Sequence, residues 1–171
     1  MDYMASMELA IRNEKTEREF YLNEASRSKN ALAKKMFSQL AEEENEHMER
    51  IHSLHGKLVA EGSWPADVPL VVGGTDIKKV LSETVSKGGS SVDHDDDDIK
   101  ALKKAIGFEA KGSELYADMA AAAETGAERE FFEFLSGIER EHKLSLEQSL
   151  AYLEDPEAWS MEQEKSTLDG A

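Results

Sequence analysis

The feature that most constrains this chain is an internal repeat at an offset of 95 residues. A shift by 95 aligns pairs of identical residues, among them Glu14 with Glu109, Tyr21 with Tyr116, Phe37 with Phe132, Glu44 with Glu139 and His47 with His142. Over 10–25 and 36–50, aligned with 105–120 and 131–145, 11 of 31 positions are identical. Because such a repeat is one structural unit used twice, we predict that the two halves fold alike and pack around a pseudo-twofold axis.

Each copy is predicted to form two long helices. The chain has only three prolines, at 65, 69 and 156, so long stretches are free to continue as helix. Breaks of a few residues within each copy make each pair an antiparallel hairpin. The expected long helices are about 2–28, 31–60, 96–124 and 127–153, with short helices at 76–86 and 156–165.

The two hairpins are joined by a long crossover connection at 62–95. A helix of this length extends roughly 40 Å at 1.5 Å per residue, and the crossover is long enough to travel that distance. The second and third long helices are therefore able to lie parallel. We predict an all-α domain over 1–171, a four-helix bundle of two repeated helical hairpins with a short C-terminal helix.

Composition excludes several classes of function. The chain carries 20 Lys and Arg against 36 Asp and Glu, a formal net charge of −16, which disfavours binding to nucleic acid or to an anionic membrane surface. The absence of Cys excludes thiolate metal sites, iron–sulfur clusters and thiol catalysis in these residues. No secretory signal and no apolar run of roughly 18 residues is visible. We expect a cytoplasmic protein that spans no membrane.

The repeated residues include a set suited to metal binding. Glu14 and Tyr21 share a helical face, and Glu44 and His47 are neighbours at i, i+3. Two hairpins that meet face to face would bring together four carboxylates and two imidazoles, a ligand set typical of di-iron and di-manganese carboxylate bundles. The candidate metal ligands are Glu14, Glu44, His47, Glu109, Glu139 and His142.

A second Glu-x-x-His pair, Glu49 and His52, is not repeated, and this distinguishes it from the candidate metal ligands. Its repeat-related positions hold Leu144 and Glu147, so the second copy lacks both residue types. We interpret this pair as part of a solvated helix face, because exposed charge is common.

The motifs Ala10-Ile11-x-x-Glu14-x6-Tyr21, Glu44-x-x-His47, Glu109-x6-Tyr116 and Glu139-x-x-His142 resemble the di-iron motifs of the ferritin-like superfamily. The resemblance is strongest to rubrerythrin-like proteins, with bacterioferritin next. It implies a ferritin-like bundle, two iron ions per chain bridged by Glu44 and Glu139, and Tyr21 and Tyr116 hydrogen-bonded to the carboxylates. It also implies reduction of hydrogen peroxide and a homodimer.

The chain departs from that family in two respects. Rubrerythrins usually carry a rubredoxin domain with four Cys, and these residues contain none, so electrons would come from an external donor such as a rubredoxin. The family also has an extra Glu where this chain has Gly112, whereas the repeat-related position holds Glu17. We raise the hypothesis that Glu17 is a seventh, redox-dependent ligand on the opposite iron. The alternative is a solvent-exposed Glu17.

Other readings of the same residues stay open. The ligand set also serves a ferroxidase or iron-storage subunit that reacts with O2, or a non-catalytic protein that holds zinc or manganese structurally. The acidic run Asp93–Asp98, which contains His94, either gathers cations for the site or forms a solvated helix entry that complements the helix dipole.

Overall fold

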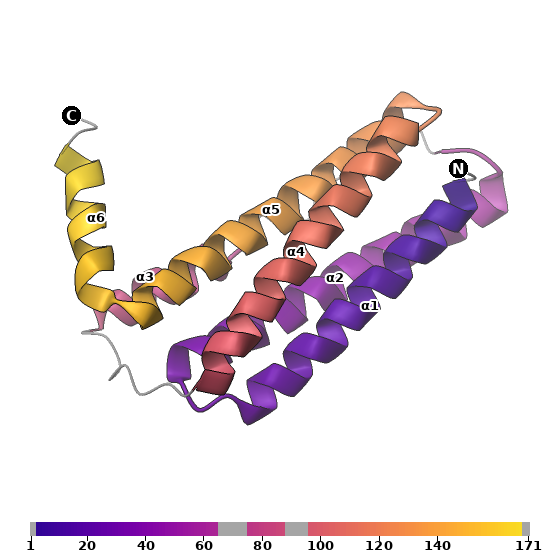
Figure 1. Ribbon diagram of the computed structural model, residues 1–171. Helices are drawn as coiled ribbons and strands as arrows, with labels where there is room; N and C mark the ends of the chain where they lie inside the picture. The colour runs from indigo at the N-terminus through magenta and orange to yellow at the C-terminus, as the bar shows by residue number, and fades with distance from the viewer. Residues whose placement is uncertain (1–2, 65–74, 88–95, 169–171) are drawn as a thin grey trace.

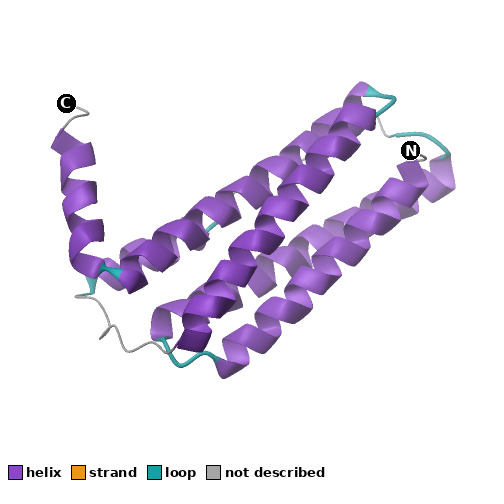
Figure 2. Ribbon diagram, viewed as in Figure 1, coloured by secondary structure: helices purple, strands orange, loops and turns teal. Residues whose placement is uncertain are grey.

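The protein is all-α. The computed structural model describes residues 3–64, 75–87 and 96–168, and within them the chain forms six helices and no strand (Figure 2). The helices are α1 (Tyr3–Arg27), α2 (Ala31–Glu61), α3 (Ile77–Ser86), α4 (Asp96–Ala122), α5 (Gly126–Glu154) and α6 (Pro156–Leu168). Their ends lie within about three residues of the ends expected from sequence.

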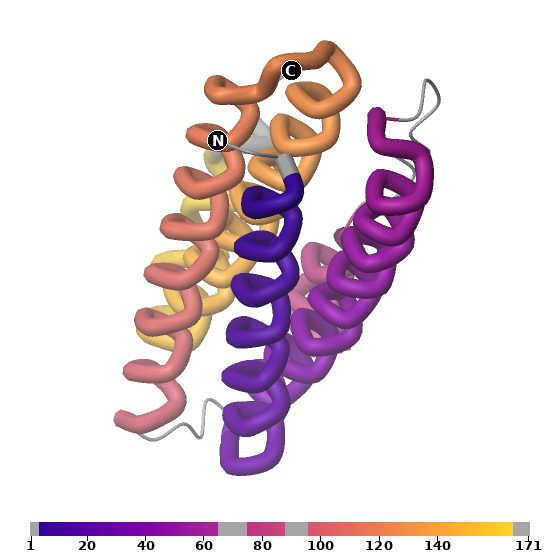
Figure 3. Tube along the Cα trace, turned by 90° about the vertical axis from the view of Figure 1, so that its right-hand side faces the viewer, coloured from indigo at the N-terminus to yellow at the C-terminus, as the bar shows by residue number. Residues whose placement is uncertain are grey.

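The helices form a ferritin-like four-helix bundle built from two hairpins. α1 packs against α2 and α4 against α5, while α1 also contacts α4 and α2 contacts α5 (Figures 1 and 3). In Figure 1, α2 and α4 run in the same direction, which confirms the predicted parallel arrangement across the crossover. Of the crossover, α3 packs against α2 and α5, whereas 65–74 and 88–95, with His94, lie outside the described residues.

The turn between α1 and α2 is fixed to the start of α4. Asn30 caps α2, because its side-chain oxygen accepts hydrogen bonds from the backbone N–H groups of Leu32 (2.9 Å) and Ala33 (3.0 Å). Its own backbone N–H donates to Asp98 Oδ2 at 3.0 Å. The last residue of the acidic run is thus buried and holds the two hairpins together at one end of the bundle.

Other helix ends are fixed by residues that favour cap and turn conformations. Gly62 ends α2 in the left-handed conformation (φ 71°), which a residue without Cβ adopts at little cost, and its N–H donates to Leu58 O. Thr125 caps α5 by accepting from the N–H of Glu128. Asp155 accepts from the N–H of Ala158 and so caps α6.

Two apolar layers of the core lie on either side of a polar middle. In one layer the rings of Tyr21 and Phe37 stack with centroids 6.1 Å apart, and in the other Tyr116 and Phe132 stack at 6.3 Å. These pairs are related by the repeat, and all four side chains are fully buried. The repeated aromatic residues therefore enclose the middle of the bundle symmetrically.

The outward helix faces are mostly polar. Glu49 and His52 are exposed, as predicted for a pair without a counterpart in the second copy. Within the described ranges, no helix combines the length and the apolar character that crossing a bilayer requires.

Replacing Asn30 by Ala should lower the free energy of unfolding by about 1 kcal/mol, because two helix N–H groups lose their acceptor. Urea denaturation of the metal-free protein measures the difference. Asn30→Ser is the matched control, since Ser also caps helices. Equal losses in both variants would contradict a capping role.

Candidate metal centre

The six predicted ligands converge in the polar middle of the bundle. Each of the four long helices contributes, and every one of the six side chains is at most 2% exposed. α1 supplies Glu14, α2 supplies Glu44 and His47, α4 supplies Glu109, and α5 supplies Glu139 and His142. The i, i+3 spacing on α2 and α5 places a carboxylate and an imidazole on the same inward face.

The ligand atoms form two groups that share two carboxylates. In one group, atoms of Glu14, Glu44, His47 and Glu139 lie within 4.8 Å of one another. In the other, atoms of Glu44, Glu109, Glu139 and His142 lie equally close. Glu44 and Glu139 belong to both, the arrangement required of carboxylates that bridge two metal ions.

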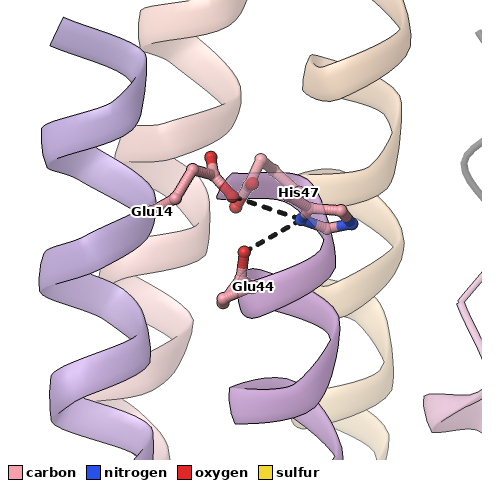
Figure 4. A group of neighbouring side chains, drawn as sticks. Glu14, Glu44 and His47 are labelled. Carbon is pink, nitrogen blue, oxygen red and sulfur yellow. Dashed lines mark hydrogen bonds and ion pairs between the residues drawn. The ribbon is translucent and has the colours of Figure 1, made fainter. Parts of the chain in front are cut away.

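Both histidines present Nδ1 to the shared carboxylate of Glu44 and to one unshared carboxylate each. His47 Nδ1 lies 3.0 Å from Glu44 Oε2 and 3.2 Å from Glu14 Oε2 (Figure 4). His142 Nδ1 lies 3.2 Å from Glu44 Oε1 and 3.3 Å from Glu109 Oε2. The two rings stack with centroids 5.7 Å apart. Glu44 thus reaches one imidazole with each of its oxygens, which places it between the two groups.

The surroundings of Glu139 give the strongest indication that this site binds cations. Glu139 is fully buried, and neither carboxylate oxygen has a hydrogen-bond partner among the described residues. An unsatisfied buried polar group costs about 1–3 kcal/mol, and a charged one costs more. Oxygen-rich sites with one imidazole per ion suit divalent first-row metals, so the residues present fit a dinuclear centre.

Two tyrosines connect the hairpins across the site. The Tyr21 hydroxyl on α1 donates to Glu109 on α4, and the Tyr116 hydroxyl on α4 donates to Glu14 on α1. The repeat relates these two hydrogen bonds, and each crosses from one copy to the other. Each tyrosine therefore holds a carboxylate of the opposite hairpin in position.

Without metal, the site is a network of perturbed titrating groups. Burial, followed by the charge of Glu44, raises the pKa of Glu14 to about 7. Burial and then the charge of Glu17 raise the pKa of Glu139 well above its ordinary value. Burial opposes the charged form of His47, yet the charge of Glu44 and hydrogen bonds to Glu14 and Glu44 raise its pKa to about 10. In the absence of metal, protons therefore occupy the carboxylate and imidazole groups that would bind metal ions.

Glu43 is a residue that the sequence did not single out. Its Oε2 lies 2.8 Å from His142 Nε2, and its Oε1 accepts from Gln39 Nε2 (2.8 Å) and from the N–H of Asp76 before α3 (3.0 Å). Burial opposes ionisation, but the hydrogen bond from His142 lowers the pKa of Glu43. A carboxylate there keeps the proton on Nε2 and leaves Nδ1 for a metal. The repeat-related residue is Ile138, so no repeated signal marked Glu43.

Glu17 lies inside the bundle and is only 3% exposed, so the alternative of a solvent-exposed residue is wrong. Burial, then the charges of Glu109, Glu44 and Glu14, raises its pKa well above the ordinary value. That Glu17 binds a metal ion in a way that depends on the oxidation state of the metal stays a prediction.

Comparison with known proteins agrees with the predicted resemblance over the first hairpin. The family model described as Rubrerythrin matches residues 6–83, a segment that runs from α1 into α3 and contains Glu14, Glu44 and His47. Searches of curated proteins and of solved structures gave no match. The ligands of the second hairpin are recognised through the internal repeat.

The metal-free protein should lose stability as the pH rises from about 5 to 10. The pKa of His47 is raised from 6.5 to about 10, and that of Glu14 from 4.5 to about 7. A raised pKa stabilises the folded state below the unfolded value, and this contribution disappears as the pH passes the folded value. Urea midpoints in a chelating buffer at pH 5, 7 and 9 measure the trend. A midpoint that rises over this range would contradict the assignment.

Glu43→Ala should weaken metal binding at the position next to His142 by about 10- to 100-fold, because the imidazole loses the partner that orients it. Titration with Mn²⁺ followed by electron paramagnetic resonance measures free metal. The control is Glu42→Ala, a change at an exposed neighbouring residue, which should bind as the wild type does. Equal binding by both variants would rule out a positioning role for Glu43.

Proposed function

We propose that this chain, which carries a rubrerythrin-family domain over residues 6–83, is a di-iron oxidoreductase that reduces hydrogen peroxide to water. The observation that carries the proposal is the pair of buried ligand groups sharing Glu44 and Glu139. Cleavage of the peroxide O–O bond consumes two electrons and two protons and yields two water molecules. Two ferrous ions held by these groups would supply one electron each.

The donor set supports iron over a structural zinc ion. Structural zinc sites are usually tetrahedral and closed, with Cys and His as the main ligands. This site offers mostly carboxylate oxygens, with one imidazole in each group. Carboxylates suit a hard cation whose charge increases on oxidation, and imidazole suits the divalent state.

The chain's own residues would position the reactants and exclude water. Tyr21 and Tyr116 hold Glu109 and Glu14 by donated hydrogen bonds, so each hydroxyl keeps a proton at the edge of the site. Glu43 fixes the ring of His142 through Nε2. The stacked aromatic pairs above and below the ligands separate the site from solvent along the bundle axis.

Electrons for a second turnover would come from another protein. The 171 residues contain no Cys and therefore no thiolate-bound electron carrier of their own. We propose an external donor such as a rubredoxin and a homodimeric assembly. Neither nucleic acid nor a membrane enters the proposed reaction, in line with the net charge of −16.

Anaerobic titration with Fe²⁺, followed by stopped-flow mixing with hydrogen peroxide or with O2, tests the proposal. We expect two Fe²⁺ per chain and much faster oxidation by peroxide than by O2. Glu139→Gln is the matched control, because it removes a shared carboxylate while keeping the side-chain shape.

Two outcomes would contradict the peroxidase assignment in different ways. Faster oxidation by O2, with uptake of more than two iron ions per chain, would indicate a ferroxidase or iron-storage subunit. Failure of the wild type to bind Fe²⁺, together with tight binding of Zn²⁺, would indicate a structural metal protein.

A further inference from the structure

We propose that α3, the short helix of the crossover, positions the metal site beside His142 through the backbone N–H of Asp76 and the carboxylate of Glu43. Docking of α3 on the bundle and metal binding beside His142 therefore stabilise each other. The inference rests on the proposed function, because it requires that the buried site hold metal. It adds to that function a link between the metal centre and the segment that joins the two hairpins.

α3 is held on the bundle by its apolar face. It packs against both α2 and α5, and its buried residues Ile77 and Leu81 belong to the same core cluster as residues of those two helices. Lys78, Lys79 and Ser82 on its other face are exposed. A helix of 10 residues is too short to be stable alone in water, so α3 depends on this docking.

The residue at the N-terminal end of α3 binds Glu43 directly. The backbone N–H of Asp76 donates to Glu43 Oε1 at 3.0 Å, and Gln39 Nε2 donates to the same oxygen at 2.8 Å. The other oxygen, Oε2, lies 2.8 Å from His142 Nε2. One oxygen of Glu43 thus ties the carboxylate to α3 and α2, while the other orients the imidazole. Because a hydrogen bond to a carboxylate is charge-assisted, the N–H of Asp76 restrains the group that orients His142.

A second contact between α3 and α5 is too exposed to explain the link. Lys78 Nζ lies 3.6 Å from Glu141 Oε2, next to His142 in the sequence, but the two side chains are 58% and 49% exposed. Solvent screens an ion pair of this kind, so it contributes little. The side chain of Glu43 is only 12% exposed. The path from α3 to the metal site therefore runs through Glu43.

The link concerns one metal position more than the other. In the second copy of the repeat, the residue equivalent to Glu43 is Ile138, whose side chain accepts no hydrogen bond. The helix that follows the second hairpin, α6, packs against α5 and extends away from the bundle (Figure 1). A change in the docking of α3 should therefore affect the ion beside His142 more than the ion beside His47.

Asp76→Pro tests the inference, because proline lacks the N–H that donates to Glu43. Asp76 has φ −85°, close to the value that the proline ring imposes, and proline is common at helix starts, so α3 should still form. In a Mn²⁺ titration followed by electron paramagnetic resonance without oxidant, the wild type should bind two ions per chain. Asp76→Pro should bind one of them at least about fivefold more weakly.

Asp76→Ala is the matched control, because it keeps the N–H and removes only the side chain. That side chain forms an exposed ion pair with Lys79 and makes no cap hydrogen bond to α3. Both wild-type affinities should be retained. Equal Mn²⁺ affinities in Asp76→Pro and Asp76→Ala would overturn the inference while leaving the di-metal site intact.

A double variant separates positioning from a general loss of stability. If the N–H of Asp76 acts through Glu43, Asp76→Pro should cause no further loss of Mn²⁺ affinity in a chain that already carries Glu43→Ala. A purely structural effect of proline would lower the affinity by the same factor in both backgrounds. That additive result would contradict the proposed path.

Amide hydrogen exchange, measured by mass spectrometry, tests the link in the opposite direction. Coupling between two equilibria is reciprocal, so loading the wild type with Mn²⁺ should slow exchange in residues 77–86 at least about fivefold. Exchange in α6, which begins beyond the end of α5, is the internal control and should not change. Loading that leaves exchange in α3 unchanged would overturn the inference. If the wild type binds no Mn²⁺, the proposed function fails together with the inference.

Discussion

Mutual repulsion among five buried carboxylates is the constraint on which the rest of this structure depends. Glu14, Glu17, Glu44, Glu109 and Glu139 are each at most 3% exposed and lie together in the middle of the bundle. Desolvation and like charges both oppose their ionised forms. Two protonated imidazoles offset part of this charge in the metal-free protein, and bound cations would offset more. The apolar layers and the crossed tyrosine hydrogen bonds hold the carboxylates close despite the repulsion.

The internal repeat explains both the symmetry of the site and its exceptions. The six ligands, the two tyrosines and the stacked aromatic pairs recur at the same offset, so each copy completes the site of the other. At two positions the copies differ. Glu43 supports His142 where the other copy has Ile138, and Glu17 occupies space that Gly112 leaves free. The symmetric residues would define two metal positions, and the asymmetric ones would make the surroundings of these positions chemically different.

Much of this arrangement could be predicted from the sequence, because the repeat identifies pairs of residues under the same constraint. Asn30, Gly62 and Asp155 stand at helix ends, and their preference for such positions is a local property that can be read from the sequence. Glu43 and Gly112 could not be assigned in this way. The contact of Glu43 with His142 depends on how α2 faces α5, and the space at Gly112 depends on how closely α4 approaches Glu139. Neither relation leaves a periodic pattern along one helix.

The most direct test of the central claim is anomalous X-ray diffraction from crystals of the protein soaked anaerobically in Fe²⁺. We expect two iron peaks in each chain between Glu44 and Glu139, one beside Glu14 and His47 and the other beside Glu109 and His142. A buried site without iron, with peaks only at exposed acidic side chains, would contradict the claim that these carboxylates are assembled to hold a pair of metal ions.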